Sequence, residues 1–170
     1  MDFPDNDIDI ELSLENEELE IKNVKGINYT RLHHLLQQER WQEADQETIK
    51  VMLQVANSEN IYFRKEDIER FPSSDLRTIN QLWLEYSKNK FGFSIQEDIY
   101  ARLGSAGESE NEVWEQFGCI VGWKQGKHWL NYEKLTFDLN LAPYGHLPTI
   151  WMDLSAHNRT SCFSLLSLNL

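Results

Sequence analysis

Residues 71–96 constrain the fold more than any other stretch, because their pattern predicts two helices joined by a short turn. Pro72 fixes its own backbone and disfavours a helical conformation at Phe71, so we expect the first helix to begin just after Pro72. Ser73 or Ser74 is the expected N-cap. Large apolar residues then recur at three-to-four-residue spacing, which places them on one helix face: Leu76, Ile79, Leu82, Trp83 and Tyr86.

A turn between two aromatic rings separates this helix from the next. Gly92 stands between two phenylalanines and permits a tight backbone path there. Ser94 and Glu97 have the S-x-x-E spacing of a capping box, so the second helix is expected to begin at Ser94. We expect it to end at Gly104. Its apolar face holds Ile95, Ile99 and Leu103.

Further helical patterns follow in the rest of the chain. Residues 26–57 predict a helical pair, residues 66–70 a short helix or turn, and residues 113–117 another short helix. The last stretch has only weak helical spacing. We therefore expect a mainly α-helical domain over residues 26–150, followed by a weakly structured C-terminal extension over residues 151–170.

The first 25 residues differ in composition from everything that follows. They contain nine acidic and two basic residues. Such a block of like charge is typical of a disordered, solvated tail. Residues 1–25 are therefore expected to stand outside the folded domain.

The overall composition excludes several classes of protein. A formal net charge of −12 argues against binding of nucleic acid, which needs clustered lysine and arginine. Two cysteines in 170 residues do not make a disulfide framework, and none of the five histidines has the ligand spacing of structural zinc. No apolar run approaches the roughly 18–20 residues of a transmembrane helix, and the N-terminus resembles neither a secretory signal nor a transit peptide. We expect a soluble protein that works in the compartment where it is made.

Two polar residues are candidates for catalysis, but a structural role is the stronger interpretation of each. His146 lies in an irregular loop at 142–148, where a hydrogen bond to loop backbone is favoured. Asp45 lies within a helical pattern and is expected to accept a hydrogen bond from neighbouring backbone or from a tryptophan. Asp75 is expected to cap the helix that follows Pro72. A hydrolase or transferase using Asp45 or His146 is the weakest functional hypothesis, since no motif of a catalytic family accompanies them.

The surplus of aromatic residues is the most informative chemical feature. The chain contains six Trp, six Tyr and eight Phe, and several of them lie in or beside predicted loops. A core under long loops explains most of these rings. A cleft of rings with few polar groups also suits a large, flat, apolar ligand.

Five motifs occur in order along the chain: DLRTINQLW at 75–83, FGFSIQ at 91–96, VGW at 121–123, LTFDL at 135–139 and APYGHLP at 142–148. Together they resemble the Genomes-Uncoupled-Four family, the tetrapyrrole-binding regulators of magnesium chelatase. The resemblance runs from Tyr29 to Pro148. Several motifs in a compatible order are far more specific than any one of them.

The resemblance implies a compact helical domain shaped like a cupped hand, with long irregular loops rich in aromatic residues. It implies a protein without enzymatic activity that binds protoporphyrin IX or Mg-protoporphyrin IX, and in some relatives a linear bilin, in a hydrophobic cleft between two flexible loops. No covalent cofactor and no protein ligand to a metal are expected. The resemblance also favours an irregular loop near Gln125-Gly126, where the sequence pattern alone allows a β-hairpin.

The partner implied by the resemblance is the large porphyrin-binding subunit of magnesium chelatase, which the protein would activate in chlorophyll synthesis. We expect a monomer in the cytoplasm of a cyanobacterium or in the plastid stroma, encoded in the plastid because no transit peptide is present. The resemblance is compatible with peripheral association of the protein with a membrane. The alternative is a divergent relative that binds a bilin, or no ligand, and serves as a sensor or interaction module.

Carried onto this chain, the resemblance places the cleft between residues 58–68 and a second loop that holds Trp129 and Tyr132 and continues through Phe137. Arg159 follows the GHLP motif and is expected near the ligand's propionates. The full set of expected ligand contacts is Tyr62, Phe63, Ile68, Phe91, Phe93, Gln96, Trp129, Tyr132, Phe137 and Arg159.

Overall fold

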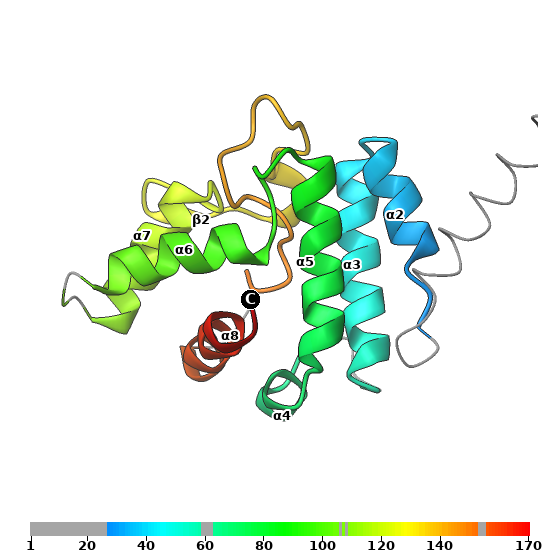
Figure 1. Ribbon diagram of the computed structural model, residues 1–170. Helices are drawn as coiled ribbons and strands as arrows, with labels where there is room; N and C mark the ends of the chain where they lie inside the picture. The colour runs from blue at the N-terminus through cyan, green and yellow to red at the C-terminus, as the bar shows by residue number, and fades with distance from the viewer. Residues whose placement is uncertain (1–26, 59–62, 106, 108, 153–155) are drawn as a thin grey trace, which may run out of the picture.

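The computed structural model describes residues 27–58, 63–105, 107, 109–152 and 156–170, and most of them are helical (Figure 1). The elements are α2 (Thr30–Gln37), α3 (Trp41–Val55), α4 (Lys65–Glu69), α5 (Ser73–Tyr86), α6 (Phe93–Gly104), α7 (Glu110–Ile120), β1 (Lys124–Gln125), β2 (His128–Trp129), a 3-10 helix (Tyr132–Lys134) and α8 (Ala156–Asn169). The predicted mainly α-helical class is confirmed. The predicted acidic tail lies outside the described residues. Among the helices described, none is long and apolar enough to cross a membrane.

The helices form two groups, and the long segment that follows α7 runs between them (Figure 1). α2 packs on α3 and α5, and α6 packs on α7. In Figure 1 the two groups stand side by side, with residues 121–152 running between them. α8 packs on α6 and on α4, the short helix that connects α3 to α5.

Buried polar contacts join α2, α3 and α5. The Trp83 indole on α5 donates to the Thr48 hydroxyl on α3 at 3.0 Å. The Tyr29 hydroxyl donates to Asp75 Oδ1 at 2.6 Å within the core. Burial raises the pKa of Tyr29, and the neighbouring Asp75 raises it further. Asp75 lies in the first turn of α5 as expected, and it is also an acceptor in the core, because the chain entering α2 brings Tyr29 to it.

The two helices predicted from residues 71–96 are present, but their caps differ from the prediction. α5 begins at Ser73 as expected, with Pro72 at the N-cap and no side-chain capping bond. α6 begins at Phe93, one residue before the predicted Ser94. Ser94 does not form the expected capping box. Its backbone N–H and its hydroxyl donate to Asn80 Oδ1 at 3.0 and 3.2 Å, so a side chain from α5 takes the place of the cap.

The expectation of an irregular loop near residues 125–126 was wrong. Strands β1 and β2 pair antiparallel, with Lys124 opposite Trp129 and Gln125 opposite His128. Gly126 has a φ of +59°, a conformation that glycine adopts without steric cost and that tight hairpin turns require. The sequence pattern therefore identified a hairpin that the resemblance argued against.

Two helices are longer or better formed than predicted. α7 starts at Glu110 and not near residue 113, because Ser109 and Glu112 form a capping box. Residues 151–170 were expected to be weakly structured, yet residues 156–169 form α8. Burial explains the second difference: α8 places Cys162, Phe163 and Leu166 in the core, and such packing stabilises helices that have little intrinsic propensity.

Replacing Gly92 by alanine is expected to destabilise the fold by about 1–3 kcal/mol. Gly92 has a φ of +131°, and a Cβ there would lie 3.0 Å from Asn80 Oδ1, the atom that holds the first turn of α6. Gly104→Ala at the other end of α6 is the matched control, since its Cβ would meet nothing within 4 Å. The control should be neutral or stabilising by up to about 1 kcal/mol. Urea unfolding measures both changes, and equal stability of the two variants would contradict the prediction.

Candidate functional site

The segment 121–152 is held against the start of α6 by hydrogen bonds to its backbone. Gln96 on α6 is fully buried, and its Nε2 donates to the carbonyl oxygens of Gly145 at 2.9 Å and Pro148 at 2.8 Å. The Gly92 N–H donates to the Leu147 carbonyl at 3.0 Å. These contacts fix the path of the APYGHLP motif.

His146 crosslinks the same segment from within. Its Nδ1 lies 2.6 Å from the Val121 carbonyl, and its Nε2 accepts from the Thr136 N–H at 3.1 Å. An N–H donor at Nε2 and a carbonyl at Nδ1 together require the neutral ring protonated at Nδ1. Burial lowers the pKa of His146, which agrees with a neutral ring. The predicted hydrogen bond to loop backbone is confirmed, and both ring nitrogens are engaged.

Asp45 anchors the far end of the segment to α3. It is fully buried, and its two oxygens accept from the Thr149 N–H and the Thr149 hydroxyl, each at 2.7 Å. The Tyr132 hydroxyl interacts with the same carboxylate and lies 3.3 Å from the Gln42 carbonyl oxygen, to which it donates. Burial raises the pKa of Asp45 to about 6, against the lowering effect of these hydrogen bonds. Burial and Asp45 also raise the pKa of Tyr132.

Lys90 closes the tip of the segment, residues 139–145. Its Nζ donates to the Leu139 carbonyl at 2.6 Å, and its own carbonyl accepts from the Gly145 N–H at 2.9 Å. One residue therefore holds both ends of the tip. Leu141 and Tyr144, within it, are 76% and 62% exposed.

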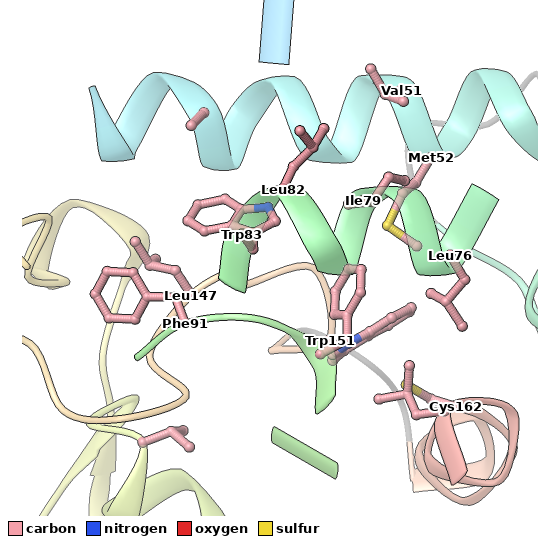
Figure 2. Close-up of a cluster of buried hydrophobic side chains, with 14 of the residues drawn as sticks. Val51, Met52, Leu76, Ile79, Leu82, Trp83, Phe91, Leu147, Trp151 and Cys162 are labelled. Carbon is pink, nitrogen blue, oxygen red and sulfur yellow. The ribbon is translucent and has the colours of Figure 1, made fainter. Parts of the chain in front are cut away.

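Five of the residues expected to contact a ligand lie in the core: Phe63, Ile68, Phe91, Phe93 and Gln96. Trp151 brings two of them together, with its ring 6.1 Å from that of Phe63 and 5.3 Å from that of Phe93. Phe91 instead packs beside Trp83 with a ring separation of 6.3 Å. Figure 2 shows Trp83, Phe91 and Trp151 within one buried cluster.

The expected contacts in the second loop are partly exposed, and they fall in two places. The rings of Tyr132 and Phe137 lie 5.2 Å apart. Trp129 stacks instead on Trp114 at 5.6 Å, and its indole donates to Glu115 Oε1 at 3.2 Å. The remaining two expected contacts, Tyr62 and the Arg159 side chain, lie outside what the structure describes. The expected set therefore forms a buried group and two partly exposed groups.

A cavity of about 430 Å³ opens between α6, α7 and α8. Tyr100, Val113 and Phe163 line its apolar side, and the rings of Tyr100 and Phe163 stack at 3.9 Å with an interplanar angle of 9°. Glu97 and Glu110 also line it. Its volume is within the range of small-molecule pockets. This cavity could not be predicted from the sequence, because it forms where α8 meets two helices from distant parts of the chain.

No metal site accompanies these features in the part of the chain that the structure describes. Within it, no group of three or more His, Cys, Asp or Glu side chains is placed to hold a metal ion.

Residues 22–163 match the family model described as GUN4-like. The Ycf53-like protein of Synechocystis sp. is 32% identical over 134 residues, which are 76% of this chain and 54% of that protein. The chain therefore spans about half the length of this curated relative. The tetrapyrrole-binding protein, chloroplastic, of Arabidopsis thaliana is 27% identical over 74 residues, 42% of this chain and 28% of that one. The structure of GUN4 from Chlamydomonas reinhardtii aligns with a TM-score of 0.64 at 25% identity, covering 84% of this chain and 88% of that one.

Replacing Asp45 by asparagine is expected to change how stability depends on pH. The pKa of Asp45 is raised to about 6 in the folded chain, above the value near 4 of an unfolded chain. The folded state then binds more protons between these values, so the stability from this group falls as pH rises through about 6. From pH 5 to pH 7 the wild type should lose about 1 kcal/mol that Asp45→Asn does not lose.

The comparison also controls for His146, whose effect has the opposite sign. Its lowered pKa means that its contribution is present above the ordinary pKa near 6.5 and is lost as pH falls below it. Because both proteins contain His146, this contribution cancels in the difference between their urea-unfolding free energies at each pH. A difference that stays constant from pH 5 to pH 7 would refute the assignment.

Proposed function

The chain belongs to the GUN4-like family, and on that premise we propose that it is a non-enzymatic protein that binds protoporphyrin IX or Mg-protoporphyrin IX. The observation that carries the proposal is the family match over residues 22–163. A relative from Arabidopsis thaliana named as a tetrapyrrole-binding protein supports the ligand class.

The chemistry of this ligand suits an aromatic surface with positive charge beside it. A porphyrin has two apolar faces and carries its propionates at one edge. Burial of half its several hundred Å² of surface at ~25 cal/mol/Å² supplies several kcal/mol, in the range of micromolar binding before association costs are counted. We propose that Tyr132 and Phe137, which are partly exposed and adjacent, contact a porphyrin face. Lys134, exposed on the 3-10 helix of Tyr132, would supply charge to a propionate.

The other expected contacts have different parts in this proposal. Phe63, Ile68, Phe91, Phe93 and Gln96 form the buried floor that supports the cleft. Trp129, in the second loop, would border the ligand, and Tyr62 would complete the first loop. Arg159, in the sequence of α8, would pair with a propionate.

We propose that the partner is the large porphyrin-binding subunit of magnesium chelatase and that the complex supports chlorophyll synthesis. Relatives from a cyanobacterium and from a chloroplast agree with a cyanobacterial or plastid origin. Peripheral association with a membrane and a monomeric state belong to the same proposal.

A second candidate is a bilin-binding or ligand-free interaction module. It is favoured by the burial of many of the expected contacts: Phe91 and Phe93 are both fully buried against other rings. Saturable binding of a linear bilin with no binding of porphyrin would indicate the bilin-binding module. Binding of neither ligand would indicate the ligand-free interaction module.

Titration with protoporphyrin IX, followed by quenching of tryptophan fluorescence, is expected to show saturable one-to-one binding with a dissociation constant on the order of 1 μM or lower. Tyr132→Ala and Phe137→Ala should each weaken binding about tenfold or more, because each removes a ring from the proposed face. Absence of saturation would refute porphyrin binding.

Two variants separate ring contact from indirect effects. Tyr132→Phe keeps the ring but loses the hydroxyl that meets Asp45, so it should bind nearly as well as the wild type. Leu141→Ala changes an exposed side chain of the tip and should have no effect. If Tyr132→Phe and Tyr132→Ala weaken porphyrin binding equally, Tyr132 acts through its hydroxyl at Asp45 and not through contact of its ring with the ligand.

Addition of the protein to magnesium chelatase is expected to raise the rate of magnesium insertion into the porphyrin. Tyr132→Ala should reduce this effect in proportion to its loss of porphyrin affinity. The inserted product is measured by its fluorescence. Normal porphyrin binding with no change in the insertion rate would retain the ligand and reject the chelatase partner.

A further inference from the structure

Helix α8 lies against the elements that bear part of the expected ligand contacts. It packs on α4 and α6 and also touches α5. Most of α4 lies within residues 58–68, the first expected cleft loop, and α6 begins with Phe93. Figure 1 shows α8 in the space between α6 and α4.

The buried side of α8 completes the aromatic core at this place. Phe163 stacks on Tyr100 of α6 and packs against Phe117 of α7 with a ring separation of 5.3 Å. Cys162 is fully buried and belongs to the same cluster as Trp151 (Figure 2). α8 therefore makes the kind of contact with aromatic rings that a flat apolar ligand would make.

Two buried polar atoms of the core lack partners, and the space next to α8 is not fully filled. Within the described part of the chain, the buried Trp151 Nε1 and Gln96 Oε1 have no hydrogen-bond partner. Buried polar atoms without a partner are rare in folded proteins and need an explanation. The 430 Å³ cavity between α6, α7 and α8 adds unfilled volume next to Tyr100 and Phe163.

α8 depends on this packing for its helical state. Its residues Ser161, Ser164, Ser167 and Asn158 belong to types that weaken a helix interior. Its buried side chains are Cys162, Phe163 and Leu166. Arg77 Nη1 on α5 donates a hydrogen bond to the Asn169 carbonyl on α8 at 3.0 Å, and this bond is exposed to solvent. A ligand that competes for the apolar contacts would therefore release the helix.

We infer that α8 occupies part of the ligand site, and that a tetrapyrrole binds against α4 and α6 by displacing α8 from them. This inference rests on the proposed function and adds its regulation: the chain covers its own site, and the ligand's affinity is reduced by the stability of that cover. The released site would offer the Trp151 N–H as a donor to the polar edge of the ligand.

The accessibility of Cys162 tests the inference directly. Cys119 is exposed, so Cys119→Ser leaves one thiol to follow. Cys162 is fully buried, and burial also raises its pKa, so it should react slowly with N-ethylmaleimide in the free protein. Saturation with protoporphyrin IX is expected to accelerate the reaction at least tenfold, as measured by mass spectrometry. An unchanged or slower reaction in the saturated complex would overturn the inference.

A pair of equal substitutions tests the competition between α8 and the ligand. Leu166→Ala removes a buried side chain from α8 and should tighten protoporphyrin IX binding about tenfold, because less docking must be undone. Leu35→Ala removes the same group from the buried side of α2 and should leave the affinity unchanged. Equal affinities of the two variants would speak against competition, and thermal unfolding confirms that each is folded.

The outcomes also separate this inference from the proposed function. If the protein binds porphyrin but Cys162 stays protected, the proposed function is supported and the displacement of α8 is refuted. Porphyrin binding by the wild type that is tighter in Leu166→Ala supports both. Binding by neither protein removes both, because the inference rests on the ligand.

Discussion

The fold depends on the fixing of one long irregular segment, residues 121–152, by buried polar side chains. Gln96 holds it from α6 and Asp45 holds it from α3, and His146 closes it on itself. Each of these side chains pairs with backbone groups that would otherwise be buried alone, and an unpaired buried group costs about 1–3 kcal/mol. The segment and the helix packing therefore stabilise one another. Neither of the two helical groups fixes this segment without the other.

The anchoring of residues 121–152 places the aromatic residues in two different environments. Phe91 and Phe93 lie on the rigid side, next to the hydrogen bonds that Gln96 makes. Tyr132 and Phe137 lie on the surface of the anchored segment. A ligand face formed on such a base needs little reorganisation, which lowers the entropic cost of binding. If a ligand displaces α8 as we infer, the affinity would depend on the stability of this helix as well as on the base.

The sequence predicted what depends on local periodicity, and it failed where distant residues decide. The helices around Leu76 and Trp83 follow from apolar spacing within one element. The start of α6 was misplaced because its cap comes from Asn80, 14 residues away, and Asp45 meets a partner 104 residues away. α8 could not be predicted, since its burial comes from α4 and α6 and not from its own pattern. For the candidate site, the residue types were predictable, but their exposure was not: packing decides which rings are covered.

The clamp that Lys90 makes on residues 139–145 has a consequence for how this chain can be altered. Because one side chain and its own carbonyl hold both ends of the tip, the residues between them are not needed to bring those ends together. The entropy of closing a loop grows slowly, by about 0.6 kcal/mol for each doubling of its length. The region around Leu141, 76% exposed, is thus a natural insertion point. A fluorophore, an epitope or a whole folded module inserted before Leu141 would leave the buried Ala142 in place.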